Sequence, residues 1–301
     1  MQPTHPSAPA PARPGLRSRL RAELLLAGAA AGWGAGFVLM KSALASQPVW
    51  PTLGWRFALA ALLVLPLAWR ERAQWRPAVL RSGLLLGLLL FAVFALLMSG
   101  LQRTSATNTG LLAGLTVVWI PLITRVWLHR PLPPAAWAGV ALCAAGVVAM
   151  AGGRLDALGA GDALVVGGSW VSALHMLLLA GSAGRLPSAS LTVLQLLVVA
   201  LLSAALGWQQ PPAPPPWEDT GFLLLVAATA LLSTALPYAV QTRYQRDTSP
   251  MRAAMIFNLE PVFAALLAFW LLHEPLGAQV ALAAALIVAG MVVAEWRPRG
   301  S

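Results

Sequence analysis

The chain has 301 residues, of which 58% are hydrophobic and only 10% are charged, and its mean hydropathy is +0.74. A soluble protein of this length has too little interior to hide so much apolar surface, so the composition excludes a soluble fold and indicates an integral membrane protein. The formal net charge of +10 does not point to a nucleic-acid partner, because the basic residues follow a membrane topology.

Ten apolar runs follow one another along the chain, each close to the roughly 20 residues with which a helix crosses a bilayer. They predict transmembrane helices over residues 22–44, 50–69, 79–101, 106–128, 134–152, 161–184, 188–207, 219–241, 250–272 and 276–295. The longest connection, residues 209–216, is rich in proline and is expected to be a stiff polyproline segment. The predicted fold class is therefore all-α and integral to the membrane.

The two ends of the chain are predicted to be tails. Residues 1–20 are rich in Pro, Ala and Arg and lack apolar periodicity, so we expect a disordered cytoplasmic tail there. Residues 296–301 form a second, short cytoplasmic tail. The apolar run at 24–44 is too long for a signal peptide and has no convincing cleavage site, so it is interpreted as the first helix.

The basic residues predict the orientation. With the N-terminus in the cytoplasm, sixteen of the twenty Lys and Arg residues fall at cytoplasmic ends of helices. Only Lys41, Arg103 and Arg154 fall outside, and Arg56 lies within the second helix. The positive-inside rule thus predicts a multi-pass protein of a bacterial-type inner (plasma) membrane, with both termini in the cytoplasm.

An internal repeat divides the chain. Thr104 and Ser105 lie 25 residues before a His-Arg-Pro-Leu tetrapeptide at 129–132, and the same pair recurs 144 residues later before His-Glu-Pro-Leu at 273–276. The predicted units, 22–152 and 161–295, hold five helices each, so the second copy enters the membrane inverted. The charge that differs between the tetrapeptides, Arg130 against Glu274, also follows the positive-inside rule.

Several motifs, in their order and spacing, are those of a known family. They are Gly32-Trp33-Gly34, Trp55-Arg56-Phe57, the Thr-Ser pairs before helices four and nine, Val118-Trp119-Ile120-Pro121, Asn258-Leu259-Glu260-Pro261 and Gly146/Gly290. Over 22–295 the chain resembles the EamA-type members of the drug/metabolite transporter superfamily. The resemblance implies a ten-helix exporter of amino acids or related metabolites, with a cavity lined mainly by helices one, three, four, six, eight and nine. Many relatives have Glu where Arg130 sits, so no acidic role transfers there.

Two prolines are candidate gating residues. Pro121 and Pro261 fall near the middle of helices four and nine, where proline removes a hydrogen bond and frees the carbonyls of Val117 and Phe257. Their separation is 140 residues rather than the 144 of the repeat, so the two kinks are expected one helical turn apart. That asymmetry would make the outward-open and inward-open states inequivalent, and a purely structural kink is the open alternative.

Three tryptophans lie too deep for the membrane interface. Trp33 in helix one and Trp170 in helix six are predicted to occupy comparable places in the two halves, and Trp119 precedes Pro121 in helix four. We expect these side chains to form an aromatic cavity wall that stacks on planar or cationic solutes. The open alternative is that they face lipid or pack between helices.

Glu260 is the only acidic residue predicted at mid-membrane depth. An ionised carboxylate there must face a wet cavity, find a partner or carry a proton, so it is the candidate amine or proton site, unless it makes a structural hydrogen bond that fixes the kink. His175 is the other titratable candidate, with a packed neutral histidine as its alternative. Tyr238 and Asn258 complete the predicted substrate-binding set.

Lys41 and Arg56 flank the outer ends of helices one and two. Lys41 shares a helical face with Trp33 and Phe37, so it is placed either at the cavity mouth, where it would attract a carboxylate, or in the headgroups, to which such side chains commonly snorkel.

No nucleophile with its base, set of metal ligands or phosphate-binding loop is visible, so we expect no enzyme, no metal site and no cofactor. The predicted function is secondary transport by alternating access, which exports neutral or aromatic amino acids. The expected partners are a small-molecule substrate, membrane lipids and a coupling proton, with the chain a monomer or a homodimer. The alternatives are a multidrug or quaternary-cation exporter of the same fold and a lipid-translocating protein.

Overall fold

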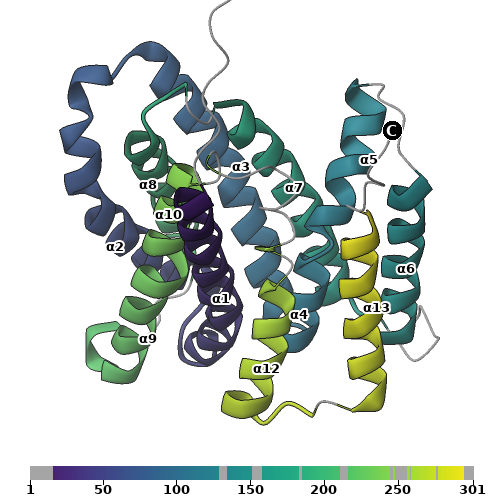
Figure 1. Cartoon of the computed structure of the whole chain (residues 1–301). Coiled ribbons are helices and arrows are strands. Elements are labelled where there is room, and N and C mark those ends of the chain that lie inside the picture. Colours follow the sequence, from purple (N-terminus) through teal and green to yellow (C-terminus); the bar gives the residue numbers. More distant parts are fainter. Residues whose placement is uncertain are drawn as a thin grey trace, which may run out of the picture.

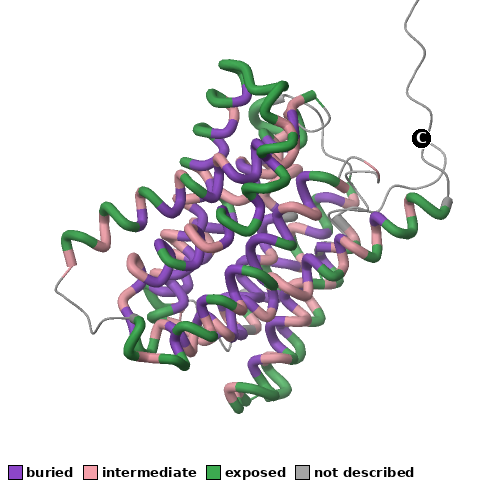
Figure 2. The backbone as a smooth tube through the Cα atoms, turned by 90° about the vertical axis from the view of Figure 1, so that its left-hand side faces the viewer, coloured by how far each residue is buried: buried purple, intermediate pink, exposed green. Residues whose placement is uncertain are grey.

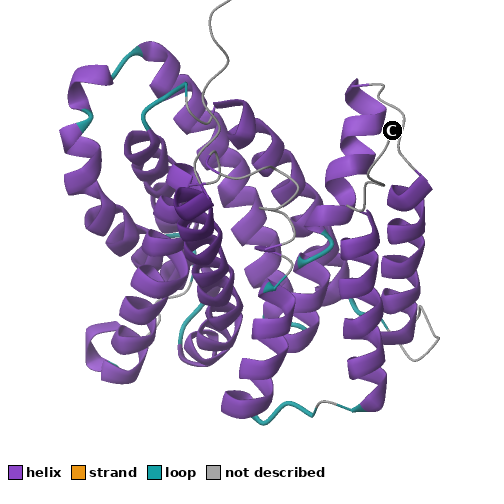
Figure 3. Cartoon of the chain, viewed as in Figure 1, coloured by secondary structure: helices purple, strands orange, loops and turns teal. Residues whose placement is uncertain are grey.

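The computed structural model describes residues 16–128, 134–150, 158–182, 185–210, 216–244, 247, 256–257, 259–275 and 277–294. Every regular element within these ranges is helical, and no strand occurs among them (Figure 3). The prediction of an all-α protein is thus confirmed for the described part of the chain.

The helices follow the predicted spans closely (Figure 1). They are α1 (Leu16–Ser46), α2 (Val49–Arg70), α3 (Pro77–Leu101), α4 (Ala106–Ala113), α5 (Thr116–Leu128), α6 (Pro134–Met150), α7 (Ala160–Ser182), α8 (Ser188–Gly207), α9 (Thr220–Ala230), the π-helical η4 (Leu231–Ala235), α10 (Leu236–Tyr244), α12 (Glu260–Leu272) and α13 (Ala278–Ala294). The described residues also include the short 3-10 turns η1 (Arg72–Gln74) and η3 (Pro216–Glu218).

Within the described ranges, seven helical stretches are long and apolar enough to cross a membrane, with α4–α5 and α9–η4–α10 each counted as one stretch. The other three predicted spans correspond to shorter apolar helices, Pro134–Gly146, Glu260–Leu272 and Ala278–Gly290. Large apolar side chains such as Leu62, Leu201 and Trp270 are exposed on the outer surface, which a bilayer would cover, while buried residues fill the middle (Figure 2).

The first helix begins earlier than predicted. α1 starts at Leu16, so residues 16–20 are helical rather than part of a disordered tail. Arg19 Nε donates to Glu23 Oε1 over 3.2 Å, and an ion pair four residues apart supports an exposed helical turn even where the apolar pattern has ended.

The helical interruptions precede both prolines. α4 ends at Ala113 and the chain turns through Gly114 and Leu115 before α5 begins at Thr116, whereas Pro121 lies inside α5. α12 likewise begins at Glu260, after a turn at Leu259, and Pro261 occupies the first helical turn, where a missing N–H costs no intrahelical bond. The interruptions therefore lie ahead of the two prolines rather than at them, and the gating role of the prolines stays a prediction.

The two interruptions are also in register. Thr116 and Glu260 each begin a helix and are 144 residues apart, the period of the sequence repeat. The helix starts thus follow the repeat period, whereas the two prolines, 140 residues apart, do not.

α6 and α13 pack against each other through two glycines that are 144 residues apart. A Cβ atom on Gly146 would lie 2.6 Å from Ile287, and one on Gly290 would lie 2.7 Å from the sulfur of Cys143. Cys143 and Ile287 are themselves 144 residues apart, and the Cys143 thiol donates to the Ile287 carbonyl oxygen over 3.4 Å. The two helices thus exchange equivalent contacts across one seam.

The end of the bundle at which α1 finishes is tied together by polar contacts, and we call it the Ser46 end (the lower end in Figure 1). Lys41 Nζ donates to the carbonyl oxygens of Leu101 and Thr104 over 2.7 and 2.6 Å. The Thr104 hydroxyl donates to Asp162 Oδ1 over 2.7 Å. Lys41 therefore joins α1 to the end of α3, and neither predicted role, at a cavity mouth or in the headgroups, describes this contact.

Glu274 adds a second tie at the same end. Its Oε1 accepts from the Ala106 backbone N–H over 2.9 Å, and its Oε2 accepts from the backbone N–H and hydroxyl of Thr107 over 3.0 and 2.6 Å. The carboxylate thus sits on the N-terminus of α4, where unpaired N–H groups and the helix dipole favour a negative charge. This contact joins the α12–α13 connection to the other half of the chain.

Candidate functional site

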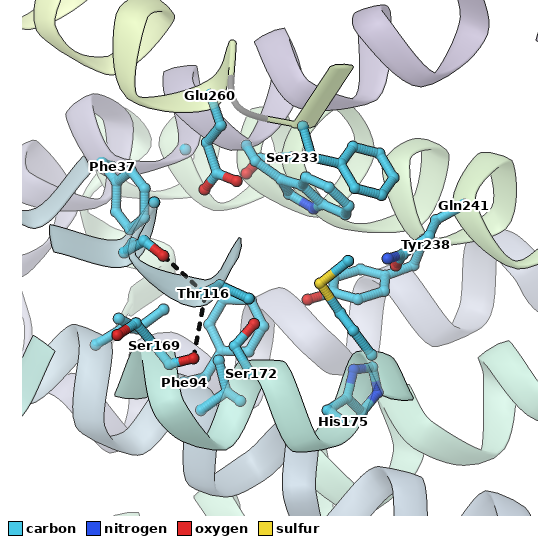
Figure 4. Close-up of a pocket in the computed structure, with 18 of the residues that line it drawn as sticks. Phe37, Phe94, Thr116, Ser169, Ser172, His175, Ser233, Tyr238, Gln241 and Glu260 are labelled. Atoms are coloured by element: carbon cyan, nitrogen blue, oxygen red, sulfur yellow. Dashed lines mark hydrogen bonds between the residues drawn. The ribbon is translucent and has the colours of Figure 1, made fainter. Parts of the chain in front are cut away.

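A cavity lies in the middle of the bundle, where α1, α2, α3, α7, η4 and α10 surround the starts of α5 and α12 (Figure 4). The polar side chains that line it are Arg56, Thr116, Ser169, Ser172, His175, Ser233, Tyr238, Gln241 and Glu260. Apart from Arg56 in α2, they come from the elements that correspond to the predicted helices four, six, eight and nine.

Aromatic rings form one wall of the cavity. The Trp33 ring meets Tyr238 and Phe257 edge to face, with centroids 5.6 and 5.1 Å apart. Phe94 also lines the cavity, with its ring centroid 6.4 Å from that of Tyr238. Such a wall offers π faces to an apolar or planar group.

Two polar atoms of the cavity have no hydrogen-bond partner among the described residues. They are the indole nitrogen of Trp33, a donor, and the side-chain oxygen of Gln241, an acceptor. A buried polar atom without a partner typically costs about 1–3 kcal/mol, so such atoms are rare unless water or a ligand supplies the missing bond. The cavity therefore offers one donor and one acceptor to a bound molecule.

Arg56 is the cation of the cavity. Only 2% of its surface is exposed, and its guanidinium donates from Nε to the Thr234 hydroxyl over 2.7 Å and from Nη2 to the carbonyl and hydroxyl oxygens of Ser233 over 3.2 and 3.1 Å. It also lies over the rings of Phe57 and Phe94, 5.5 and 5.1 Å from their centroids. Arg56 thus points into the bundle and not toward a membrane surface.

Glu260 approaches the cavity from the start of α12. Its carboxylate points into the space between the helices, opposite Ser172 and His175 (Figure 4). No described residue donates a hydrogen bond to it, so the structural hydrogen bond considered as its alternative role is not found in this part of the chain. The backbone places the group here because α12 begins at this residue.

His175 lies on the opposite side, in α7. It is buried, and its Nε2 is 2.7 Å from Gln195 Oε1 in α8, whose amide nitrogen donates to the Leu191 carbonyl. One ring nitrogen is therefore held by α8 while the side chain lines the cavity.

Trp119 lies behind the lining. Its indole nitrogen donates to the Ser169 hydroxyl over 3.0 Å, and the Thr116 hydroxyl donates to the Ser169 carbonyl over 3.2 Å. Trp119 thus fixes a lining residue without lining the cavity itself, which corrects its predicted place in the wall.

Trp170 is turned away from the cavity. Its side chain is 41% exposed on the outside of α7, whereas its neighbour Ser169 lines the cavity. One residue along a helix is a rotation of about 100°, so these two neighbours point in clearly different directions. The structure therefore does not bring Trp170 to the cavity that Trp33 lines, and its position matches the open alternative of a lipid-facing tryptophan.

Among the predicted binding residues, Trp33, His175, Tyr238 and Glu260 line the cavity. Asn258 lies outside the described residues. Pro121 and Pro261 are not among the lining residues.

Several lining residues were not predicted: Phe94, Arg56, Thr116, Ser169 and Gln241. Arg56 gave a readable signal, a charge inside an apolar span, but it was placed at a helix end. The others are ordinary residues of transmembrane helices, and the sequence gives no sign of which way they face.

Comparison with known proteins identifies relatives for nearly the whole chain. The sequence model of the EamA-like transporter family matches residues 20–152 and, a second time, residues 159–295. An uncharacterized transporter of Archaeoglobus fulgidus is 26% identical over 280 residues, which cover 93% of this chain and 87% of that protein. A solved structure titled only "Crystal structure of protein" shares the fold, with a TM-score of 0.68 at 22% identity over 92% of this chain and 96% of that one.

Proposed function

Because the chain belongs to the EamA-like transporter family, within the drug/metabolite transporter superfamily, we propose that it is a secondary transporter that exports small neutral or aromatic amino acids. The observation that carries the proposal is the central cavity, which combines an aromatic wall with a buried cation, a carboxyl group and two unpaired polar atoms. Selective sites for small molecules typically combine a mostly apolar surface with a few oriented polar groups.

The proposed topology is an inverted repeat of residues 22–152 and 161–295 in a bacterial-type inner membrane, with both termini in the cytoplasm. Three observations support it: the family model matches twice, α6 and α13 exchange equivalent contacts, and Thr116 and Glu260 begin helices one repeat apart. A binding site near the middle of the membrane between two repeats is typical of such carriers.

In this topology the Ser46 end faces outward. The contacts of Lys41 and Glu274 then hold the outer end closed, so this conformation blocks access from outside. Transport requires those contacts to open while the opposite end closes, with the interruptions ahead of Pro121 and Pro261 as the points where α4–α5 and α12 bend. Trp33, His175, Tyr238 and Glu260 form the proposed binding set, and a proton on Glu260 is the proposed coupling ion.

Counterflow into liposomes that hold the purified protein tests the function. Vesicles are loaded with one unlabelled amino acid, and uptake of the labelled compound is compared with that of purines and quaternary amines. Amino-acid counterflow that exceeds that of empty liposomes is the expected result. Selective counterflow of a quaternary amine would replace the proposal with the multidrug alternative, and movement of labelled lipid without any solute would replace it with lipid translocation.

A further inference from the structure

Arg56 is a buried charge that neutral groups hold in place. Its described hydrogen bonds go to the hydroxyls of Ser233 and Thr234 and to one carbonyl, and no ion pair within 4.0 Å joins it to a described carboxylate. An arginine at membrane depth is costly unless an anion or water compensates it. The guanidinium is therefore oriented by its neighbours but not neutralised by them.

The guanidinium also keeps donors for a ligand. It has five N–H groups in a planar fork, and the described bonds use Nε and Nη2 only. Nη1 donates to no described residue, and Arg56 lines the cavity. The two N–H groups of Nη1 are therefore left to donate to a carboxylate oxygen of a ligand.

Glu260 gives the same cavity an opposite charge. Arg56 and Glu260 both line it, yet they are not within ion-pair distance of each other. The two groups come from different halves of the chain, α2 and the start of α12. A cavity with a cation and an anion that do not neutralise each other suits a ligand that carries both charges.

We infer that the cavity binds α-amino acids as zwitterions, with the carboxylate on Arg56, the ammonium group on Glu260 and the side chain against the aromatic wall of Trp33, Tyr238 and Phe257. The unpaired oxygen of Gln241, which is 2% exposed, can accept a bond from the ammonium group, and the Trp33 N–H can donate to the carboxylate. The inference rests on the proposed transport function and assigns the two charged groups of its substrates to Arg56 and Glu260.

Ligands with a single charge fit less well. A quaternary amine would pair with Glu260 and leave Arg56 buried without an anion, and a simple organic acid would do the reverse. Leaving one charge uncompensated carries a large cost, so the two groups together select against both classes.

The test uses four compounds with the same ring: L-phenylalanine, its amide, phenethylamine and 3-phenylpropionate. Each competes with labelled L-phenylalanine for binding to the purified protein and for counterflow. The amide and phenethylamine lack the carboxylate and 3-phenylpropionate lacks the ammonium group, so each is expected to bind at least about tenfold more weakly than phenylalanine. Equal competition by the amide would overturn the role of Arg56, and equal competition by 3-phenylpropionate would overturn that of Glu260.

Two variants test which residue binds which charged group of the ligand. Arg56→Gln is expected to bind phenylalanine at least about tenfold more weakly and to lose its preference over the amide, while Glu260→Gln loses the preference over 3-phenylpropionate. Arg81→Gln, the same change on the exposed face of α3, is the matched control and keeps both preferences. Preferences retained in Arg56→Gln and Glu260→Gln would overturn the inference.

If Arg56→Gln fails to fold, competition by the four compounds on the unaltered protein still tests whether both charged groups of the ligand are recognised. The inference and the transport proposal also fail in different ways. If amino acids are transported without regard to their charged groups, only the zwitterion inference falls. If no amino acid moves in counterflow, the transport proposal itself fails and the inference falls with it.

Discussion

Glu274 and Thr107 lie 167 residues apart in sequence, and the carboxylate of the first accepts both the backbone N–H and the hydroxyl of the second. The contact places a negative charge on the first turn of α4 and joins the two halves of the chain at the Ser46 end. An interaction of this kind typically contributes about 0.3–1 kcal/mol, and up to about 2 kcal/mol where it is partly buried. It is therefore strong enough to bias a conformational equilibrium but weak enough to break during the proposed transport cycle.

Glu274→Gln should shift the protein toward an outward-open state, because the amide keeps the size but loses the charge. The measurement is the rate at which a membrane-impermeant maleimide, added from outside, labels Ser172→Cys in a Cys143→Ala background. We expect the rate to rise about two- to tenfold. Glu218→Gln, in the exposed turn η3, is the control. An unchanged rate in Glu274→Gln would show that this contact does not hold the outer end closed.

Glu260→Gln should remove the pH dependence of amino-acid transport. Acid adds a proton to the carboxylate and removes the charge that would attract an ammonium group, so transport by the unaltered protein should fall as the pH is lowered. The amide is neutral at every pH, so its transport should be lower and flat. Initial rates of counterflow from pH 5 to 8 give the two profiles.

Other titratable groups line the same cavity: Arg56, His175 and Tyr238. Of these, histidine ordinarily titrates closest to neutral pH, so His175→Gln is the matched control and should keep the acid-side fall. A profile that becomes flat in His175→Gln but not in Glu260→Gln would move the proton site to α7.

Trp33→Ala should weaken binding of planar amino acids more than that of aliphatic ones. Edge-to-face and stacked ring contacts are worth about 0.5–1.5 kcal/mol beyond the area they bury, so the affinity for phenylalanine should fall about two- to twelvefold more than that for leucine. Competition binding of the two amino acids to the purified variant gives the ratio.

Trp119→Phe should behave differently, because Trp119 contacts Ser169 rather than the cavity. The change removes the indole donor and leaves a ring of similar packing. We expect it to weaken binding of phenylalanine and leucine by the same factor. A selective loss of phenylalanine in Trp119→Phe, with none in Trp33→Ala, would exchange the roles given to the two residues.

Gly290→Ala should destabilise the protein. The added methyl group would lie 2.7 Å from both the Cys143 sulfur and the Gly139 carbonyl oxygen, and overpacking against backbone typically costs about 1–3 kcal/mol. Gly28→Ala is the matched control, since nothing lies within 4 Å of a Cβ there and alanine favours the helix. Thermal unfolding in detergent should give a lower Tm for Gly290→Ala only. Equal Tm values for the two variants would show that the contact between α6 and α13 accommodates the added methyl group.

The helical character and the approximate positions of the apolar segments were predictable because apolar length is what a bilayer requires of a helix. The rotation of each helix was not. In a soluble protein the outward face is polar and reveals the inward one, but here Leu62 and Leu201 face outward and are as apolar as the core. For this reason the sequence does not reveal that Trp170 faces away from the cavity while Trp33, between two glycines that allow close approach, lines it.

The helix interruptions were misjudged for a different reason. Proline was taken to mark them, but Pro261 fits a helix start without penalty and Pro121 lies within α5. Gly114 gave the better signal, because glycine weakens a helix without forbidding it. Arg56 shows a third limit: its three hydrogen-bond acceptors come from Ser233 and Thr234, about 177 residues away, and no local pattern records such a pairing.

The seam between α6 and α13 has a practical consequence. No described side chain of either helix lines the cavity, and the two helices pack chiefly against each other. Leu282 is exposed on α13, so a fluorophore attached at that position would report on the surroundings of the bundle without touching the solute. The exposed face of α13 is also a place where a crystallisation chaperone or an affinity tag could be attached without altering the residues that line the cavity.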